Sequence, residues 1–519
     1  MSSIEVVLAL LLLATVLAGV ARRARIPEPI LLVLAGIVVG LLPNVPNVEL
    51  EPDLVFLLFL PPILYSAGFF TSIRDFKANL RPILLLSVGL VLFTTIVAAA
   101  VLKAFVPGLP WAAAFAFGAI VSPPDAVAAT AVFRRLRVPR RMVTILEGES
   151  LVNDATALVL LRTSLVALAF GGTFDVVAAS ANFVVVVIGG IAVGLVAGRI
   201  AGWFTTRIQE PDLGIVLSLL VPVLAYIPAE AIGVSGVLAV VVAGIYAGRI
   251  AARSLTSAQR VEGMAAWNIV LFLINGLVFM LIGLQLPVIL GDLDGSAWAL
   301  IALAVVMGAT VIGTRIVWVF STVYLSGLLP PRFRVLNPVP SWQRVAIVSW
   351  AGMRGVVSLA AALALPTNFP ERSLVQFLTF TVIFATLVVQ GLTLPVLIKV
   401  LRVSTDDNAA EEERMARLLA AQAAVARIDR LEAEYPGHRE LIDHLRETYA
   451  HRVEHIEPVD GQTIDEAVEE LLEHRKIRRA VIDAERDAVI AMRDRGELSD
   501  EVMRRLERDL DLEELREDA

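Results

Sequence analysis

Three acidic side chains lie deep inside long apolar segments of this sequence, where a charge is costly. Asp125 lies in a segment rich in Ala, Val and Phe, and Glu149 and Asp154 lie in the next apolar segment. At the centre of a lipid bilayer a charged side chain costs at least about 2.5–3.5 kcal/mol, so acids in such segments mark ion or proton pathways by default. These three residues are therefore the first candidates for chemistry.

Asp125 directly follows two successive prolines, Pro123 and Pro124. Because proline has no N–H group, two carbonyl groups one turn earlier lose their helical partners. At membrane depth, freed carbonyls are tolerated only where they face protein or a water-filled cavity, and many transporters build ion sites in this way. A simple proline kink is the alternative, but it does not explain the acid. We predict a broken helix near 122–124, where carbonyls around Ser122 and Pro123 join Asp125 in a cation site.

The segment after Asp125 carries a polar stripe on one helical face. At 100° per residue, Glu149 shares a face with Asn153, and Ser150 shares a face with Asp154. Carboxylate, hydroxyl and amide oxygens are hard ligands that suit small hard cations such as Na⁺. Hydrogen bonding between helices is the alternative, but it does not require acids on two adjacent segments. We therefore expect Asp154, Asp125 and Ser150 to bind a metal cation, with Asn153 beside them.

A third polar break occurs at Gly352-Met353-Arg354-Gly355. The glycines permit an unwound segment, and a buried arginine needs a carboxylate partner. Glu149 is the candidate. We predict a second broken helix near 352–355 and a structural Glu149–Arg354 ion pair that fixes the geometry of the core.

No histidine lies in the apolar part of the chain, so a transported proton must be carried by a carboxylate. Asp154 is the best candidate, because it is deep and its neighbour Asn153 is neutral. The deprotonated acid binds the cation and the protonated acid does not. If such a site opens alternately to each side of a membrane, it exchanges the two ions. The five histidines all lie near the C-terminus, at His438, His444, His451, His455 and His474.

These residues require membrane-spanning helices to position them. Hydrophobic residues make up 57% of the 519 residues and charged residues 18%, and the mean hydropathy is +0.76. Soluble domains are less apolar and more charged. We predict about thirteen transmembrane helices, which lie near 4–21, 28–43, 53–71, 81–105, 111–133, 142–170, 178–204, 212–229, 232–250, 262–287, 296–325, 342–366 and 373–401.

Charge divides the chain into two parts. Residues 1–402 contain 26 Lys and Arg against 18 Asp and Glu, whereas residues 403–519 contain 18 against 33. With the N-terminus outside, the basic residues gather in the loops on one side, and acids at 49–53, 175 and 292–294 gather on the other. This positive-inside pattern predicts a multi-pass protein of the cell membrane with a cytoplasmic C-terminal tail.

The acidic tail, 403–519, is expected to form amphipathic helices interrupted at 435–437 and 458–461. It is interpreted as a small helical bundle or a docking element, with a regulatory sensor as the alternative. The sequence contains no nucleotide-binding loop and no nucleic-acid patch, and with no cysteine it cannot form a disulfide or a thiolate metal site.

The motifs resemble those of the monovalent cation:proton antiporter family, of the sodium/proton exchanger type. The resemblance rests on 122–128 (SPPDAVA), 147–154 (EGESLVND), 60–68 (LPPILYSAG), 313–315 (GTR) and 352–355 (GMRG). The tail has no such match.

This resemblance implies an all-α fold of thirteen helices in inverted repeats, with the fifth and twelfth helices broken where they cross. It implies homodimers in which helices 1–3 and 7–10 form a dimerisation scaffold and helices 4–6 and 11–13 form a transport core. Asp154 would bind the cation or the proton, Asn153 would indicate electroneutral exchange, and Glu149 and Arg354 would form the buried pair. Many members have threonine where this chain has Pro124, so a backbone carbonyl remains as a ligand but a hydroxyl is lost.

We therefore expect an electroneutral sodium/proton antiporter, with no enzymatic activity and no cofactor beyond the transported ions. Its expected partners are a second copy, membrane lipid and an unidentified regulator of the tail, but no nucleic acid. The alternatives are an antiporter of potassium or lithium as well, a cation channel gated by the tail, and a sensor without transport.

Overall fold

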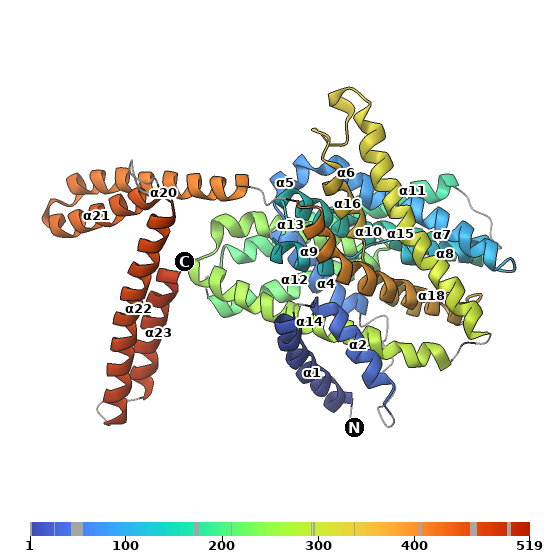
Figure 1. Cartoon of the computed structure of the whole chain (residues 1–519), viewed down its shortest axis with the longest axis horizontal. Coiled ribbons are helices and arrows are strands. Elements are labelled where there is room, and N and C mark those ends of the chain that lie inside the picture. The colour runs from blue at the N-terminus through green and yellow to red at the C-terminus, as the bar shows by residue number, and fades with distance from the viewer. Residues whose placement is uncertain are drawn as a thin grey trace. The chain divides into compact units, whose positions relative to one another are not determined.

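The computed structural model (Figure 1) describes residues 3–24, 26–42, 55–136, 138–170, 176–208, 210–291, 293, 296–336, 338–403, 407–456, 464–495 and 500–518. These residues form helices and connecting loops, with no strand among them. The chain divides into two compact units, Met1–Thr405 and Asp406–Ala519. The predicted acidic positions at 49–53, 175, 292 and 294 and the predicted turn at 458–461 lie outside the described residues.

The first unit is built from apolar helices and a few short turns. In chain order these are α1 (Ser3–Ala24), α2 (Glu28–Gly40), η1 (Val55–Phe59), α4 (Leu60–Phe70), α5 (Ile73–Ala78), α6 (Leu80–Leu84), η2 (Leu85–Leu90), α7 (Val91–Phe105), α8 (Trp111–Val121), α9 (Ala126–Arg135), α10 (Arg140–Ala169), α11 (Val176–Thr205), α12 (Pro211–Ala231), α13 (Gly236–Ser254), α14 (Ser257–Gly291), α15 (Ala297–Gly327), η3 (Pro331–Phe333), α16 (Trp342–Trp350), α17 (Val356–Leu363), α18 (Arg372–Ala385), η4 (Thr386–Gln390) and α19 (Gly391–Val400).

Ten helical segments among the described residues are long and apolar enough to cross a membrane. Glu28–Gly40 and Val55–Phe70 are shorter apolar helices, and the pair α16 and α17 occupies the predicted span 342–366. The prediction of an all-α polytopic membrane protein is confirmed. The count of thirteen spans and the inverted repeats stay predictions.

Proline marks the start of several of these helices. Pro29, Pro61 and Pro211 lie in the first turns of α2, α4 and α12. The first turn suits proline because its N–H group would have no helical partner there, and the ring fixes φ near the helical value. The same residue inside a helix removes a hydrogen bond, and this effect produces the break before Asp125.

Small residues let neighbouring helices approach closely. A Cβ placed on Gly36 of α2 would lie 2.2 Å from the Met280 carbonyl oxygen of α14, and one placed on Gly283 would lie 2.2 Å from the Val33 oxygen. In a membrane, where apolar surface gives no drive to associate, such close packing of small residues holds helices together. α2 and α14 therefore form a tightly packed pair.

The two predicted breaks are confirmed, and they meet. Residues 122–125 separate α8 from α9, and residues 351–355 separate α16 from α17. The Asp125 backbone N–H donates to the Met353 carbonyl oxygen at 2.7 Å. The unwound stretches therefore touch each other, with α10 packed against α8.

The second unit consists of two helical hairpins, α20 (Asp407–Glu434) with α21 (Arg439–Ile456) and α22 (Ile464–Asp494) with α23 (Asp500–Asp518), which Figure 1 shows in orange and red. A short turn, η5 (Pro436–His438), lies at the predicted interruption. Arg446 bonds Glu432 and Asp443, each at 2.7 Å, and Asp429 at 3.2 Å. Each hairpin has such an arginine, the second being Arg486.

Candidate ion-binding site at the helix crossing

Asp125 lies at the N-termini of two helices at once. It is the N-cap of α9, where its Oδ1 accepts a hydrogen bond from the Val127 N–H at 2.8 Å. Its Oδ2 lies against Gly355, the N-cap of α17, because a Cβ placed on Gly355 would come within 2.0 Å of this oxygen. Helix N-termini carry partial positive charge and favour an anion. One carboxylate therefore compensates the partial positive charge of both half-helices that start at the crossing.

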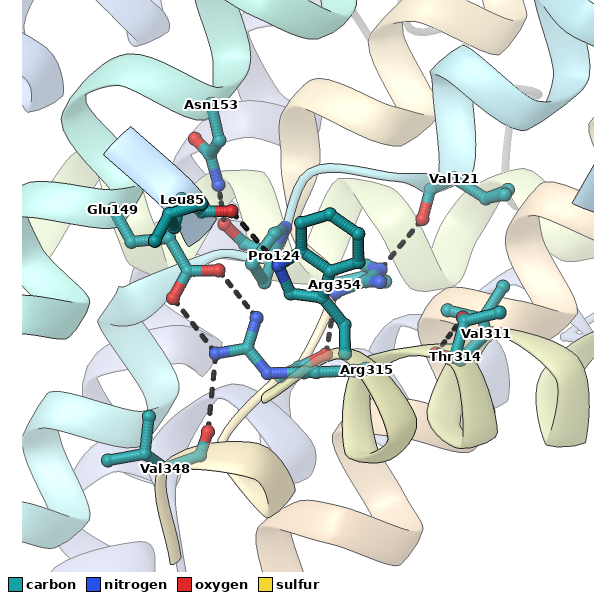
Figure 2. Close-up of polar contacts among 12 residues, drawn as sticks. Leu85, Val121, Pro124, Glu149, Asn153, Val311, Thr314, Arg315, Val348 and Arg354 are labelled. Carbon is teal, nitrogen blue, oxygen red and sulfur yellow. Dashed lines mark hydrogen bonds and ion pairs between the residues drawn. The ribbon is translucent and has the colours of Figure 1, made fainter. Parts of the chain in front are cut away.

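Arg354 has the complementary position, because it lies at the C-terminal ends of α8 and α16. Its Nε donates to the carbonyl oxygen of Val121, the last residue of α8, at 2.7 Å, and its Nη1 donates to the Gly352 oxygen, just past α16, at 2.9 Å (Figure 2). Helix C-termini carry partial negative charge and favour a cation. The fully buried guanidinium thus replaces donors that the broken helices lack.

The predicted Glu149–Arg354 pair is wrong, because Arg315 of α15 takes the place of Arg354. Arg315 Nη1 and Nη2 bond Glu149 Oε1 and Oε2 at 2.5 and 2.9 Å, with both side chains 1% exposed (Figure 2). A bidentate arginine–carboxylate pair is a strong charge-assisted contact. Arg354 Nε and Nη1 instead reach carbonyls exposed by the two breaks, and its Nη2 has no hydrogen-bond partner among the described residues.

Asn153 and Asp154 have different surroundings although they are adjacent on α10. Asn153 is fully buried, and its Nδ2 donates to the Pro124 carbonyl oxygen at 2.7 Å (Figure 2). Asp154 is 7% exposed and interacts electrostatically with Asp125. Among the described residues, no group donates a hydrogen bond to its carboxyl. The amide nitrogen of Asn153 is thus engaged at the break, whereas its Oδ1, like the Asp154 carboxyl, has no hydrogen-bond partner among the described residues.

The other predicted ligands lie on α10 and at the break between α8 and α9. Ser122 is fully buried and donates from Oγ to the Ala119 oxygen at 2.9 Å, which pairs one of the carbonyls that the prolines leave free. Ser150 lies one helical turn before Asp154 and is half-buried. Pro123 borders a small hollow lined by apolar side chains of α8, α10 and α17. Within the described part of the chain, no three acidic or histidine side chains cluster to hold a metal ion. A cation here would need hydroxyl or backbone oxygens in addition to carboxylates.

Two contacts of the membrane unit were not predicted from the sequence. Thr386, the first residue of η4, accepts a hydrogen bond from the Arg354 backbone N–H at 3.1 Å. Arg162 of α10, inside an apolar span, forms an ion pair with Glu230 of α12.

A family model described as "Sodium/hydrogen exchanger, transmembrane" matches residues 8–400. The chain belongs to the sodium/hydrogen exchanger family. The resemblance predicted from the motifs is therefore confirmed, and the chain is an integral membrane protein.

Similar members of this exchanger family come from several bacteria. An uncharacterised Na⁺/H⁺ exchanger of Mycobacterium tuberculosis is 35% identical over 519 residues, covering 97% of this chain and 94% of the relative. One of Escherichia coli is 34% identical and covers 96% and 95%. A sodium, potassium, lithium and rubidium/H⁺ antiporter of Bacillus subtilis is 35% identical, covering 76% of this chain and 61% of that protein.

The fold also matches a solved exchanger structure. The sodium proton antiporter MjNhaP1 of Methanocaldococcus jannaschii superposes with a TM-score of 0.60 at 20% identity, covering 77% of this chain and 98% of that chain. The likeness concerns the architecture, and the chemistry of this exchanger-family member rests on its own residues.

Proposed function

We propose that this protein exchanges a monovalent cation for a proton by alternating access, with Asp154 binding either ion in competition. The single observation that carries the proposal is the contrast at the crossing. Arg315, Arg354, Glu149 and Asp125 are engaged by fixed partners, whereas the buried Asp154 carboxyl has no donor among the described residues. An acid in such a position can lose a proton only if a cation compensates its charge.

The charges at the crossing support an electroneutral exchange of one cation for one proton. Two arginines and three acids lie there, so with all of them ionised the net charge is −1. The four half-helix ends add two positive and two negative partial charges, which cancel. Either one monovalent cation or one proton brings the site to neutrality. A second cation would leave it charged in a medium where charge is costly.

Sodium is the proposed cation, with Ser150, Asp125 and carbonyls near Ser122 and Pro123 completing its shell. A broader range that includes potassium and lithium is the second candidate, favoured by the range of cations for which the Bacillus subtilis relative is named. The structure adds one relevant contact. The Pro124 carbonyl already accepts a hydrogen bond from Asn153, so it contributes less to a tight cation cage than a free carbonyl would. A tail-gated channel lacks a supporting observation.

The remaining proposals concern assembly and topology. We propose a homodimer in the cell membrane, with the N-terminus outside and the acidic tail in the cytoplasm, as the distribution of basic residues favours. Helices 1–3 and 7–10 would form the scaffold, and helices 4–6 and 11–13 would form a core that moves against it. We propose that the protein is a transporter without enzymatic activity and that transport requires no cofactor.

An exchange assay with purified protein reconstituted in proteoliposomes tests this function. With the membrane potential clamped, an imposed pH gradient should collapse when lithium, sodium or potassium is added. The order of the apparent KM values ranks the cations. Exchange that proceeds at one rate whatever the voltage supports electroneutrality. Current without a pH change on cation addition would identify a channel instead.

A further inference from the structure

The unwound segment between α16 and α17 depends on one hydroxyl group outside it. Among the described residues, Thr386 Oγ1 is the side-chain acceptor for a backbone amide of segment 351–355, that of Arg354, at 3.1 Å. An amide at membrane depth without a partner costs several kcal/mol in hydrocarbon, so this acceptor matters for where the segment lies. Thr386 is fully buried, and water does not compete for the contact.

Thr386 is itself held rigidly. Its Oγ1 lies 2.8 Å from the Val382 oxygen and 3.0 Å from the Ile383 oxygen, to which it donates. It begins η4, a π-helical turn between α18 and α19, and π-helical turns often occur at functional sites. The next turn packs on the same segment, because a Cβ placed on Gly391 would lie 3.4 Å from Met353 Sδ.

The position of segment 351–355 in turn fixes Asp125. The Met353 carbonyl accepts from the Asp125 N–H at 2.7 Å, and Gly355 leaves room for the Asp125 carboxyl. Arg354, whose backbone Thr386 holds, reaches the Val121 carbonyl of the other break with its side chain. A shift of this segment therefore moves Asp125 and the end of α8 together.

We propose that Thr386 is a positioning residue of the ion site, which acts through the Arg354 amide on Asp125. It touches neither ion. Its hydroxyl sets how far the Asp125 carboxyl stands from Asp154, and hence how strongly the site binds the cation. This inference rests on the proposed exchange function. It assigns a role to a helix that carries none of the acids.

The test compares three substitutions in proteoliposomes. Thr386→Val has nearly the same shape as threonine but no hydrogen-bond acceptor, whereas Thr386→Ser keeps the hydroxyl group. Thr381→Val is the matched control, because among the described residues the Thr381 hydroxyl bonds carbonyls of its own helix, at 2.9 and 3.0 Å. We expect Thr386→Val to raise the apparent KM for sodium about five- to twentyfold, as expected for one lost buried hydrogen bond, and to shift the pH profile of exchange. Thr386→Ser and Thr381→Val should keep the wild-type KM.

Thr386→Val with wild-type KM and pH profile would overturn the proposal, as would a variant that loses only folded yield. If Thr386→Val does not fold, the KM values of Thr386→Ser and Thr386→Cys are compared with that of the wild type instead. A KM that stays at the wild-type value in the serine variant and rises in the cysteine variant, whose thiol is the weaker acceptor, supports the role, and equal KM values in all three proteins overturn it. Wild-type protein without exchange would instead refute the proposed function, so the two failures are distinguishable.

Discussion

At the scale of single residues, the crossing separates charges that hold the structure from a charge that can change. Asp125 and Arg354 compensate helix ends, and Glu149 and Arg315 neutralise each other. Each of these groups has a fixed partner, and moving it would leave another buried group unpaired. Asp154 is the exception, which is the property that a binding group for an exchangeable ion needs.

Asp154→Asn should abolish exchange while the protein still folds. The amide keeps the shape of the acid but can neither ionise nor bind a proton at neutral pH. Exchange is measured in proteoliposomes, and folding is measured by size-exclusion chromatography in detergent. Exchange at the wild-type rate in this variant would remove Asp154 from its proposed role. Asn153→Ala is a useful comparison, because it should loosen the Pro124 carbonyl and lower the rate without abolishing exchange.

Arg315→Met should strongly destabilise the protein, because it leaves Glu149 buried without its partner. Breaking one side of a buried ion pair costs about 3–5 kcal/mol, whereas replacing both sides is often neutral. The double variant Arg315→Met/Glu149→Gln should therefore recover much of the folded yield and thermal stability. A double variant no more stable than Arg315→Met would contradict the pairing.

Much of this site could be predicted from sequence, because a buried acid in an apolar segment is conspicuous. Asp125, Asn153 and Asp154 meet at the crossing as the spacing indicated. The partner of Glu149 could not be predicted. Arg315 and Arg354 both lie in apolar segments, and only the packing of α15 against α16 and α10 decides which guanidinium reaches the carboxylate. Thr386 gave no signal, since buried threonines usually bond their own helix.

At the scale of helices, two features shape the membrane unit. They are the breaks between α8 and α9 and between α16 and α17, and the contacts that α10 makes. The prolines that separate α8 from α9 cost helix stability, and Asp125 and Arg354 compensate the exposed helix ends. The spans themselves follow from hydropathy. The π-helical turns η1, η2 and η4 do not, because hydropathy does not register a local change of backbone hydrogen-bond partner.

Replacing both prolines tests the break. Pro123→Ala/Pro124→Ala restores two N–H donors and favours a continuous helix by about 3 kcal/mol per position. A continuous helix would draw Asp125 away from its N-cap position, so we expect higher thermal stability and loss of exchange. Pro222→Ala, inside α12, is the control that should keep exchange. Normal exchange in the double proline variant would show that the break is not required.

Among the described residues, helix α10 is bound to different parts of the unit by three ion pairs besides Glu149–Arg315. Arg162 pairs with Glu230 of α12, whose Oε1 also accepts from the Gly236 N–H at 3.0 Å. Arg140 lies 3.5 Å from Asp75 of α5. In contrast, Glu147 pairs with Arg134 of α9 at 3.1 Å, inside the proposed core. The Arg162–Glu230 contact therefore joins the proposed core to the proposed scaffold.

Linking that contact covalently should stop exchange, if the core moves against the scaffold. The chain has no cysteine, so Arg162→Cys/Glu230→Cys can be bridged selectively with a cleavable bifunctional thiol reagent. We expect exchange to be lost on linking and recovered on reduction. The pair Arg134→Cys/Glu147→Cys, bridged in the same way, should remain active. Full activity of the first pair when linked would refute motion between α10 and α12.

At the scale of the whole molecule, an apolar unit is followed by an acidic unit with a different source of stability. The tail hairpins bury few large apolar side chains among their described residues and carry many ion pairs. A hydrogen bond from Arg427 lowers the pKa of Glu434, and one from Arg414 lowers the pKa of Glu411. Such carboxylates stabilise the fold above the pKa of the unfolded chain, and this contribution is lost as pH falls through the lower, folded pKa.

The tail should therefore unfold more easily in acid. Circular dichroism of the segment 407–519 should show a lower melting temperature below about pH 4 than at neutral pH, with a smaller difference in high salt. Glu434→Gln should lower the melting temperature at neutral pH and leave it unchanged in acid. A melting temperature independent of pH would mean that these ion pairs contribute nothing.

The balance of buried charge at the crossing also decides what can drive this protein. A translocated core with no net charge gains nothing from a voltage that is worth about 2.3 kcal/mol per elementary charge for each 100 mV. The direction of transport then depends only on whether the cation or the proton is more steeply concentrated across the membrane. If exchange is electroneutral as proposed, then in a cell whose medium is more alkaline than its cytoplasm the proton gradient drives the cation inward rather than outward.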